Sequence, residues 1–448
     1  MVVGWRRLRR GKKKKKEKEE KVEEEEVVTP NHFRCPISLE LMKDPVTLST
    51  GITYDRESIE TWFDQGSFTC PLTNNLVSNS DLIPNHTLRM IIQDWCVENQ
   101  RCGVQRIPTP RVPITPNDVH HLLLLLHAKA SRLDQDACLQ LVHKIQRWGA
   151  ESHRNMRCLV DNGAPTALAS AFYAFANADV NADDDSVERN PYVCVLHQML
   201  SALNSMFPTQ SEPIQHLGSP PSLRCIVSFL RRQDLSGKES SIVALKHLLS
   251  FGHHQHLEAL AQIEGINQLL VEFLNPRIFS PTIVKASLAV VWYLVSSSSP
   301  CTHKMRLKFV ELGMVCVVVD ILVDSERSLC ERALGVLESL CACEEGREKA
   351  YGNALAIPLL VKKLLRVSPL GSDYSVCAIW RLCKFGEEMA LLEALQVGLF
   401  QKLLLVLQVG CGDDTKEKAT QLLKLLNPYR GSAVECVDSD FKNLKRSM

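Results

Sequence analysis

Most of the chain carries apolar residues at helical spacing. Between residues 117 and 428, apolar side chains recur three and four positions apart, which places them on one face of an α-helix. The two-residue alternation typical of strands is absent from this stretch. A first helix is expected to begin at Thr115, where threonine, proline and aspartate stand in the order of an N-cap, a first helical position and a capping box. The pattern predicts an all-helical domain.

This helical stretch repeats itself. A ten-residue apolar phrase occurs at residues 265–274, 313–322, 356–365 and 398–407, with weaker copies at 163–172 and 221–230. From residue 221 onward the copies are about 42 to 48 residues apart, and an acidic insert at 179–185 accompanies the longer gap before them. About 20 residues after most copies, a second apolar helix is expected to open on a small residue: Ala244, Ala286, Ala333, Ser375 or Ala419. This period is typical of armadillo and HEAT solenoids, and the small residues favour the armadillo type.

Residues 29–103 follow a different pattern, with short elements between polar turns. A hairpin is expected over residues 46–53, turning at Thr50–Gly51. A helix should follow, with Asp55 as its N-cap and Gly66 at its end. Its core-facing residues should be the apolar ones that share a face: Ile59, Trp62 and Phe63.

A second helix of this region should begin at Asn85. The apolar residues expected to close a small core are Leu88, Ile91, Ile92 and Trp95. Residues 104–116 contain four prolines and are predicted to be a semi-extended linker to the helical repeats at 117–428. Flexible tails are expected at residues 1–28 and 429–448.

The formal net charge is only +1, but the first 28 residues are strongly charged. Residues 5–16 are mainly Lys and Arg, and residues 17–26 are mainly Glu. Such a segment cannot bury enough apolar surface to fold, so a disordered tail is expected. A solvated tail, a nuclear-import signal and peripheral contact with an anionic membrane surface are the open alternatives for its role.

Cysteine usage points to a reducing compartment. The 17 cysteines are scattered without the even spacing of a disulfide framework. The sequence shows no apolar signal segment and no run of about 20 apolar residues. We therefore expect a cytoplasmic or nuclear protein with no transmembrane segment, no nucleic-acid partner and no cofactor.

Two Cys-Pro loops, at Cys35–Pro36 and Cys70–Pro71, flank the first predicted helix. Two cross-braced zinc sites would need eight ligands in close pairs, and no C-x2-C pair exists here, so a zinc site is not expected. A network of salt bridges and hydrogen bonds should hold the loops instead. Its candidate members are the polar residues at the turns: Ser38, Glu40, Lys43, Asp44, Thr50, Asp55 and Arg56.

The run CPI, MKDPV, TGITYDR and CPLT resembles the U-box, the ubiquitin-ligase module that keeps the RING shape without zinc. The resemblance implies that the module docks a ubiquitin-conjugating enzyme (E2) carrying ubiquitin as a thioester, which substrate lysine attacks directly. The docking residues it implies are Ile37, Trp62 and Pro71. That Ile37 and Trp62 serve only the core is the open alternative.

The resemblance also identifies one departure from the pattern of such ligases. Many ligases of this type carry a cationic residue at the position of Asn74, so slower ubiquitin discharge is expected, because an uncharged hydrogen bond is weaker.

A thioester on Cys35 or Cys70 would need a histidine and a carboxylate nearby. His32 and His86 have no obvious carboxylate partner in the sequence, and a structural role is expected for both cysteines.

A U-box, a linker and armadillo repeats together resemble the plant U-box/armadillo family of ubiquitin ligases. The resemblance implies that the repeats bind the protein substrate, with Trp292, Trp380 and Arg381 as candidate contacts; the alternative is that the tryptophans belong to the core. Lysines 12–21 are expected targets of self-modification, and U-box homodimers are possible partners.

Two other functions compete with this one. A non-catalytic armadillo scaffold or adaptor is the alternative, mildly favoured by Asn74. A transport factor is disfavoured, because the positions of its peptide-binding asparagine ladder hold Tyr293, Ser339 and Arg381.

Overall fold

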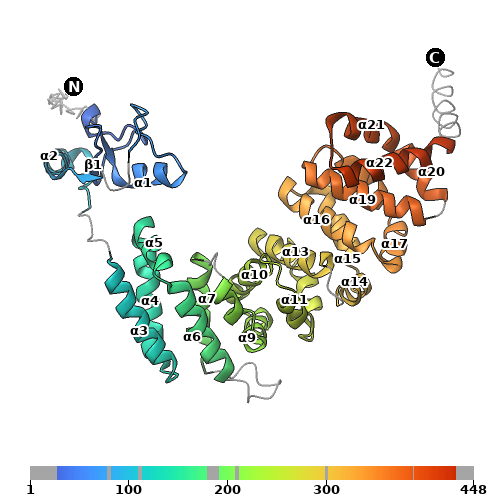
Figure 1. The fold of residues 1–448 in the computed structure, drawn as a ribbon, viewed down its shortest axis with the longest axis horizontal. Coiled ribbons are helices and arrows are strands. Elements are labelled where there is room, and N and C mark those ends of the chain that lie inside the picture. Colours follow the sequence, from blue (N-terminus) through green and yellow to red (C-terminus); the bar gives the residue numbers. More distant parts are fainter. Residues whose placement is uncertain are drawn as a thin grey trace, which may run out of the picture. The chain divides into compact units, whose positions relative to one another are not determined.

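The computed structural model describes residues 28–77, 82–108, 114–178, 191–206, 211–297, 301–386 and 388–429. The chain divides into two units, Met1–Pro113 and Ile114–Met448 (Figure 1). The basic tail, the acidic insert and the carboxyl-terminal tail predicted from the sequence lie outside the described residues, apart from their first or last positions.

A small antiparallel sheet organises the first unit. Strand β1 (Pro45–Thr47) lies between β2 (Thr53–Asp55) and β3 (Ile83–Pro84). The predicted hairpin is the β1–β2 pair, in which Val46 lies opposite Tyr54. Gly51 adopts a φ of +80° in its turn, a conformation that glycine reaches at no steric cost.

Two helices complete this unit. Helix α1 (Arg56–Asp64) buries Ile59 and Phe63, as predicted, and Gly66 follows its end at a φ of +86°. Helix α2 (His86–Glu98) is capped as predicted by Asn85, whose side chain accepts a hydrogen bond from the Leu88 amide (3.0 Å). Short 3₁₀ turns, η1 (Asn31–Phe33) and η3 (Gln100–Cys102), flank these elements.

The inward face of α2 differs from the prediction at one position. Ile91 is 47% exposed, so its assignment to the core was wrong. Ile92 and Cys96 are fully buried instead, and Leu88 and Trp95 pack partly against the same core. Ile92 and Cys96, which are four residues apart, therefore lie on the inward face of α2, and Ile91 does not.

The segment after residue 103 still contacts the first unit. Ile107 is buried in its core and Val104 packs against it. The Arg89 guanidinium donates a hydrogen bond to the main-chain oxygen of Pro108 (2.8 Å). The first part of the predicted linker is therefore packed rather than free, while Ile114 packs against the core of the second unit.

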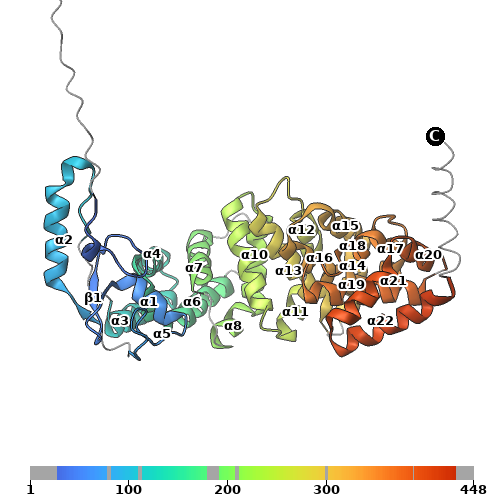
Figure 2. The same ribbon diagram turned by 90° about the horizontal axis from the view of Figure 1, so that it is seen from above.

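The second unit consists of helices that recur in threes (Figure 2). It begins with a pair, α3 (Pro116–Ala130) and α4 (Gln135–Glu151), and α3 carries the predicted capping box between Thr115 and Asp118. The short first helices of the triplets are α5 (His153–Asp161), α8 (Ser211–Leu217), α11 (His254–Ala261), α14 (Thr302–Glu311), α17 (Glu344–Tyr351) and α20 (Glu388–Gln396). The second helices are α6 (Ala164–Ala178), α9 (Pro220–Arg231), α12 (Ile266–Glu272), α15 (Met314–Asp324), α18 (Ala356–Lys363) and α21 (Leu399–Val409). The third helices are α7 (Val193–Ser205), α10 (Leu235–Leu249), α13 (Pro281–Ser296), α16 (Arg327–Leu340), α19 (Pro369–Phe385) and α22 (Asp413–Leu426).

The third helices stack on one another from α4 through α22, each packing against the next. Every copy of the repeated sequence phrase corresponds to a second helix, so the predicted repeat is confirmed. Four of those helices follow a glycine with positive φ, which turns the chain out of the first helix: Gly163, Gly265, Gly313 and Gly398.

The small residues lie elsewhere than predicted. They were expected to open the third helices, but α13 begins at Pro281 and α16 at Arg327. Ala286 and Ala333 lie inside these helices and are buried. A small side chain at that depth lets neighbouring third helices approach closely.

One continuous apolar cluster runs through the second unit, from Val119 to Leu426. No single helix of the described residues is long and apolar enough to cross a membrane, although α20 and α21 together pass that test of length and composition despite a 73° bend between them. Leu399, Leu403 and Val406 of α21 are buried in the cluster.

Candidate functional site

The first loop, residues 33–42, is a tight turn closed by its own main chain. The Cys35 amide donates a hydrogen bond to the oxygen of Glu40, and the Leu39 amide donates to the oxygen of Cys35, both at 2.8 Å. Leu39 adopts a φ of +60°, in the left-handed region that non-glycine residues rarely occupy. Its side chain is 70% exposed.

The second loop, residues 68–77, repeats this arrangement. The Cys70 amide donates to the oxygen of Asn75, and the Asn74 amide donates to the oxygen of Cys70, again at 2.8 Å. Asn74 takes the left-handed position with a φ of +56°, which asparagine tolerates better than most residues. The two Cys-Pro motifs thus fold into the same turn, and Asn74 occupies the place that Leu39 has in the first loop.

The Cys35 thiol is a buried structural acceptor. Its sulfur accepts a hydrogen bond from the Asp55 amide at 3.3 Å. Burial acts to raise the pKa of Cys35, but hydrogen bonds from the amides of Ser38, Asp55 and Ile37 and from the Ser58 hydroxyl prevail and lower it. The sulfur therefore fastens the first loop to the strand β2 and to α1.

The Cys70 thiol does the same for the second loop. The Tyr54 hydroxyl lies 3.2 Å from its sulfur, and the Thr50 hydroxyl donates to it at 3.4 Å. Burial opposes ionisation, yet the hydrogen bonds from Thr50, Thr73 and Tyr54 lower the pKa of Cys70 to about 6. The pKa of Tyr54 is raised, by burial and by its bond to Cys70. Both thiols are fully buried, which disfavours either as a nucleophile for thioester formation.

Asp55 has a different partner from the predicted one. It stands at the N-cap position of α1, but its side chain makes no capping bond. One carboxylate oxygen instead accepts the amides of Lys43 and Asp44, both at 2.8 Å. Asp55 therefore joins β2 to the end of the first loop rather than closing α1.

The remaining network residues divide into two kinds. Arg56 donates to the carboxylate of Asp44 at 2.6 Å and lies 3.8 Å from Glu60, so two of the candidate network residues form an ion pair. Lys43 and Glu40 contribute main-chain groups to the described bonds, and the Ser38 hydroxyl accepts only a long bond from the Glu40 amide (3.4 Å). The loops are held mainly by side chains that bind main-chain amides.

Helix α1 carries contacts to both loops on one face. Ser58 lies beside the Cys35 thiol of the first loop and helps to lower its pKa. Trp62, four residues later and hence one turn along, donates from its indole nitrogen to the oxygen of Thr69 in the second loop (2.8 Å). The two loops therefore lie along successive turns of this helix face.

The residues implied as docking contacts lie at this face. Ile37 and Trp62 are half-buried and pack against the core, and Pro71 is half-buried beside Cys70. Ile37 and Trp62 therefore serve the core while keeping part of their surface exposed. The structure adds apolar side chains that the sequence analysis did not single out, with Leu72 60% and Phe68 53% exposed. The equivalence of the two loops could have identified Leu72, because it is the counterpart of Ile37.

No cluster of His, Cys, Asp or Glu in the described parts of the chain could hold a metal ion. Hydroxyls and an amide contact the thiols of Cys70 and Cys35. Two equivalent Cys-Pro loops around one helix, followed by stacked three-helix repeats, define a U-box joined to an armadillo-type solenoid.

The candidate Trp292 bridges two third helices of the solenoid. A side chain on Gly335 of α16 would come within 2.7 Å of its indole nitrogen, so the glycine makes room for the ring of α13. The Arg332 guanidinium lies over the same ring, 5.6 Å from its centre. Trp292 is half-buried and packs against the core.

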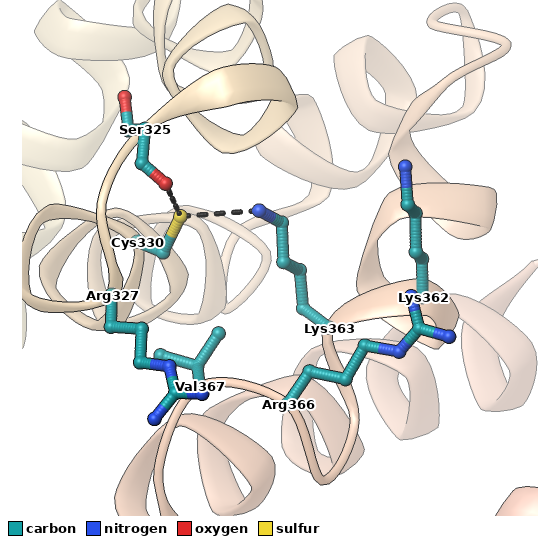
Figure 3. A pocket seen from close by; sticks show the side chains of 7 residues that line it. All are labelled: Ser325, Arg327, Cys330, Lys362, Lys363, Arg366 and Val367. Carbon is teal, nitrogen blue, oxygen red and sulfur yellow. Dashed lines mark hydrogen bonds between the residues drawn. The ribbon is translucent and has the colours of Figure 1, made fainter.

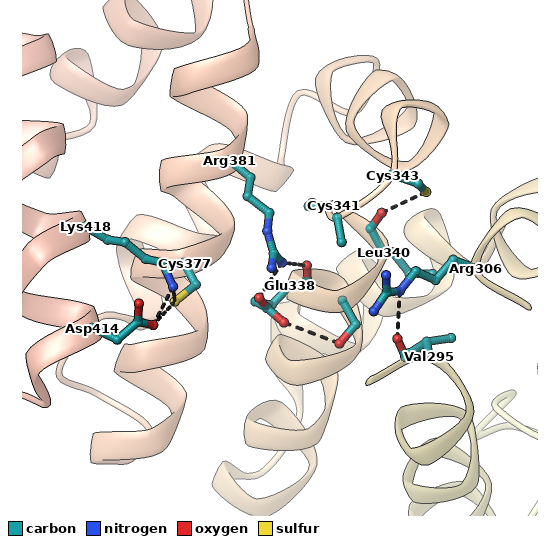
Figure 4. Close-up of polar contacts among 12 residues, drawn as sticks. Val295, Arg306, Glu338, Leu340, Cys341, Cys343, Cys377, Arg381, Asp414 and Lys418 are labelled. Carbon is teal, nitrogen blue, oxygen red and sulfur yellow. Dashed lines mark hydrogen bonds and ion pairs between the residues drawn. The ribbon is translucent and has the colours of Figure 1, made fainter. Parts of the chain in front are cut away.

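Trp380 and Arg381 make similar bridges from α19. The Trp380 indole donates to Gln421 of α22 at 2.7 Å. Arg381 is paired with the carboxylate of Glu338 on α16 and also donates to its main-chain oxygen (Figure 4). All three candidates are engaged within the solenoid, and only their remaining exposed edges are open to a partner. Tyr293 and Ser339 likewise offer no amide ladder, since Tyr293 is half-buried and Ser339 is buried.

Comparison with known proteins agrees with this architecture. Residues 29–101 match the U-box domain, and residues 118–446 match the plant U-box protein ARM repeat region. U-box domain-containing protein 21 of Arabidopsis thaliana is 40% identical over 422 residues, covering 94% of this chain and 93% of that protein. E3 ubiquitin-protein ligase PUB23 of Arabidopsis thaliana is 35% identical over 402 residues, covering 88% and 92%.

A designed armadillo repeat protein, YIII(Dq)4CqI, aligns with a TM-score of 0.45 and 19% identity, covering 57% of this chain and 99% of that one. The chain belongs to the plant family of U-box proteins with armadillo repeats.

Proposed function

We propose that this protein is an E3 ubiquitin-protein ligase whose U-box docks a ubiquitin-charged E2 and whose solenoid binds the protein to be modified. The observation that carries the proposal is the face of α1, where the Trp62 indole binds the second loop and Ser58 lies beside the Cys35 thiol of the first. The names of several relatives, including PUB23 and PUB22, support the ligase activity.

The chemistry follows from positioning. Ubiquitin passes directly from the E2 thioester to a substrate lysine, and the ligase contributes proximity and orientation. The burial of both loop cysteines supports a mechanism without a covalent ubiquitin intermediate on this chain. Ile37, Trp62, Pro71 and Leu72 offer a partly apolar contact to the E2.

The test is a reconstituted self-ubiquitination reaction with activating enzyme, several E2 enzymes and ubiquitin. Ile37→Ala and Pro71→Ala should abolish the ubiquitin ladders, whereas Val28→Ala should not, because Val28 is an exposed apolar residue outside the two loops and outside α2. The wild-type reaction should survive a strong zinc chelator. Circular dichroism melting controls for the folding of each variant.

The competing function is a non-catalytic scaffold. A folded wild-type protein that forms no ladder with any E2 would favour it. Loss of ladders on chelation alone would contradict the zinc-free reading of the loops.

Partner and location are proposals as well. Homodimers of the U-box are supported by apolar Met90 and Ile91, which α2 leaves exposed. A cytoplasmic or nuclear site of action is supported by the cysteines of the described residues, all of which are free thiols.

A further inference from the structure

A cavity of about 120 Å³ lies where the start of α16 meets the end of α18 and the loop that follows it (Figure 3). Its lining includes four cationic residues: Arg327, Lys362, Lys363 and Arg366. Ser325, Cys330 and Val367 complete the lining, which contains no carboxylate. The cavity lies outside the U-box, and its lining does not include Trp292, Trp380 or Arg381.

The acidic residues closest in sequence are engaged elsewhere or do not line the cavity. Glu326 forms an ion pair with Lys285 of α13. Glu331 accepts a hydrogen bond from the Ser368 hydroxyl. Asp324 precedes Ser325 but is not part of the lining. Within the described residues, none of the four cations has a carboxylate in an ion pair.

Lys362 and Lys363 are not needed to cap the carboxyl end of α18. The free oxygens at the end of α18 are already bound by Lys402, whose ammonium group donates to Val361 and Lys362. Burial and the neighbouring charge of Arg366 lower the pKa of Lys402. Lys362 and Lys363 therefore have no role in capping that accounts for their charges.

One of these lysines is held in place. The ammonium group of Lys363 points at the Cys330 sulfur, 3.2 Å away, and that thiol donates to the main-chain oxygen of Ser325 at 3.2 Å (Figure 3). A thiol offers much weaker solvation to an ammonium ion than a carboxylate does. Arg327 and Cys330 belong to the first turn of α16, whose free amides add positive potential at this end of the helix.

We propose that this cavity binds the phosphate group of a phosphorylated serine or threonine in the substrate protein. A phosphate monoester carries about −1.5 to −2 charges and three acceptor oxygens, which suits a cluster of Arg and Lys. About 120 Å³ holds several water molecules, and hence one phosphate-sized group rather than a large polyphosphate. The concave form of the site favours a single group over a flat membrane surface. The proposal rests on the proposed function, in which the solenoid selects a protein substrate.

The experiment uses the full-length chain and a degenerate peptide library with a central phosphoserine, compared with its unphosphorylated counterpart by fluorescence polarisation. The double variant Lys363→Gln, Arg366→Gln should lose at least about tenfold in affinity for the phosphorylated library, because each charge-assisted contact is worth a factor of this order. The matched control is the double variant Lys349→Gln, Lys416→Gln. Both lysines are exposed, and the two substitutions remove the same amount of charge at positions outside the cavity. The control variant should retain binding.

Inositol hexakisphosphate and vesicles containing phosphatidylserine distinguish other sources of anionic groups. Tighter binding of either one than of the phosphopeptides, lost in the cavity variant, would overturn the proposal. Equal binding of the two peptide libraries, or equal loss in both double variants, would also overturn it.

Self-ubiquitination separates this proposal from the proposed function. The cavity variant should form ladders as the wild type does, while Ile37→Ala should keep phosphopeptide binding. A chain that binds the phosphopeptides but forms no ladder with any E2 would contradict the ligase activity alone.

Discussion

The U-box and the solenoid hold themselves together by different means. In the U-box, Cys35, Cys70 and Asp55 collect main-chain amides and hydroxyls that fix two loops against a small core. In the solenoid, an apolar cluster continues from repeat to repeat. The loss of one polar group should therefore destabilise the whole U-box, whereas a substitution in the solenoid should destabilise only neighbouring repeats.

The largest expected effect is at Asp55. Asp55→Ala removes two charge-assisted bonds to the amides of Lys43 and Asp44 and should destabilise the U-box by about 3 kcal/mol or more, a large share of the stability of so small a domain. Hydrogen exchange followed peptide by peptide should show faster exchange throughout α1 and both loops. Glu57→Ala, at an exposed position of the same helix, is the control. Unchanged exchange in Asp55→Ala would show that the loops do not depend on this carboxylate.

A smaller and local effect is expected at Gly335. Gly335→Ala places a carbon within 2.7 Å of Trp292 and 3.1 Å of Tyr374, and such overpacking should cost about 1–3 kcal/mol. Faster exchange should be confined to α13, α16 and α19. Gly352→Ala meets only contacts of 3.6 Å or more and should have little effect. Faster exchange in the U-box as well would contradict the expectation that a substitution in the solenoid acts locally.

The Cys70 thiol of the U-box and the buried thiols of the solenoid should give pH dependences of stability with opposite signs. Burial raises the pKa of Cys138 to about 11 and of Cys341 and Cys383 to about 12, whereas the pKa of Cys70 is lowered to about 6. Stability from Cys70 is fully present above its ordinary pKa of 9.0 and is lost as the pH falls toward about 6. Stability from the solenoid thiols is present below 9.0 and is lost as the pH rises through 9 toward about 11 or 12.

Chemical denaturation at several pH values, read by hydrogen exchange in each unit, measures both trends. Cys70→Ser should flatten the dependence of the U-box between pH 6 and 9 and leave that of the solenoid unchanged. A U-box that became less stable over this interval would contradict the assignment of Cys70 as a hydrogen-bonded thiolate.

The smallest effect on stability is expected at Asn74. Asn74→Arg places a cationic residue where the sequence resemblance implies one and should accelerate ubiquitin discharge from the E2 by about fivefold, because charge assistance roughly doubles the strength of a hydrogen bond. The left-handed backbone at this position should cost arginine about 1 kcal/mol in the fold. Single-turnover discharge to free lysine measures the rate, and Asn75→Arg is the control. An equal gain in both variants would mean that added charge, rather than position, is responsible.

Much of the fold was predictable because its signals are local. The helical period and the repeated phrase located the second helix of each triplet. Asn85 correctly predicted the start of α2, Gly51 the hairpin turn and Gly66 the end of α1. The short first helices were not singled out, since a segment such as α17 (Glu344–Tyr351) has few apolar residues to show a period. Ile91 was misassigned because neighbouring apolar positions on one helix compete, and packing decides which of them faces the core.

The candidate site divides in the same way. The sequence by itself determined the two Cys-Pro loops, the helix between them, the repeat and the family they indicate, because each depends on residues close together along the chain. Only the tertiary structure decided that Asp55 binds the first loop, that Arg381 is paired with Glu338, and that Arg327 meets Lys363 at one cavity. The physical reason is that charges and hydrogen bonds act over a few ångströms in space, and the residues that share them come from elements that only folding brings together.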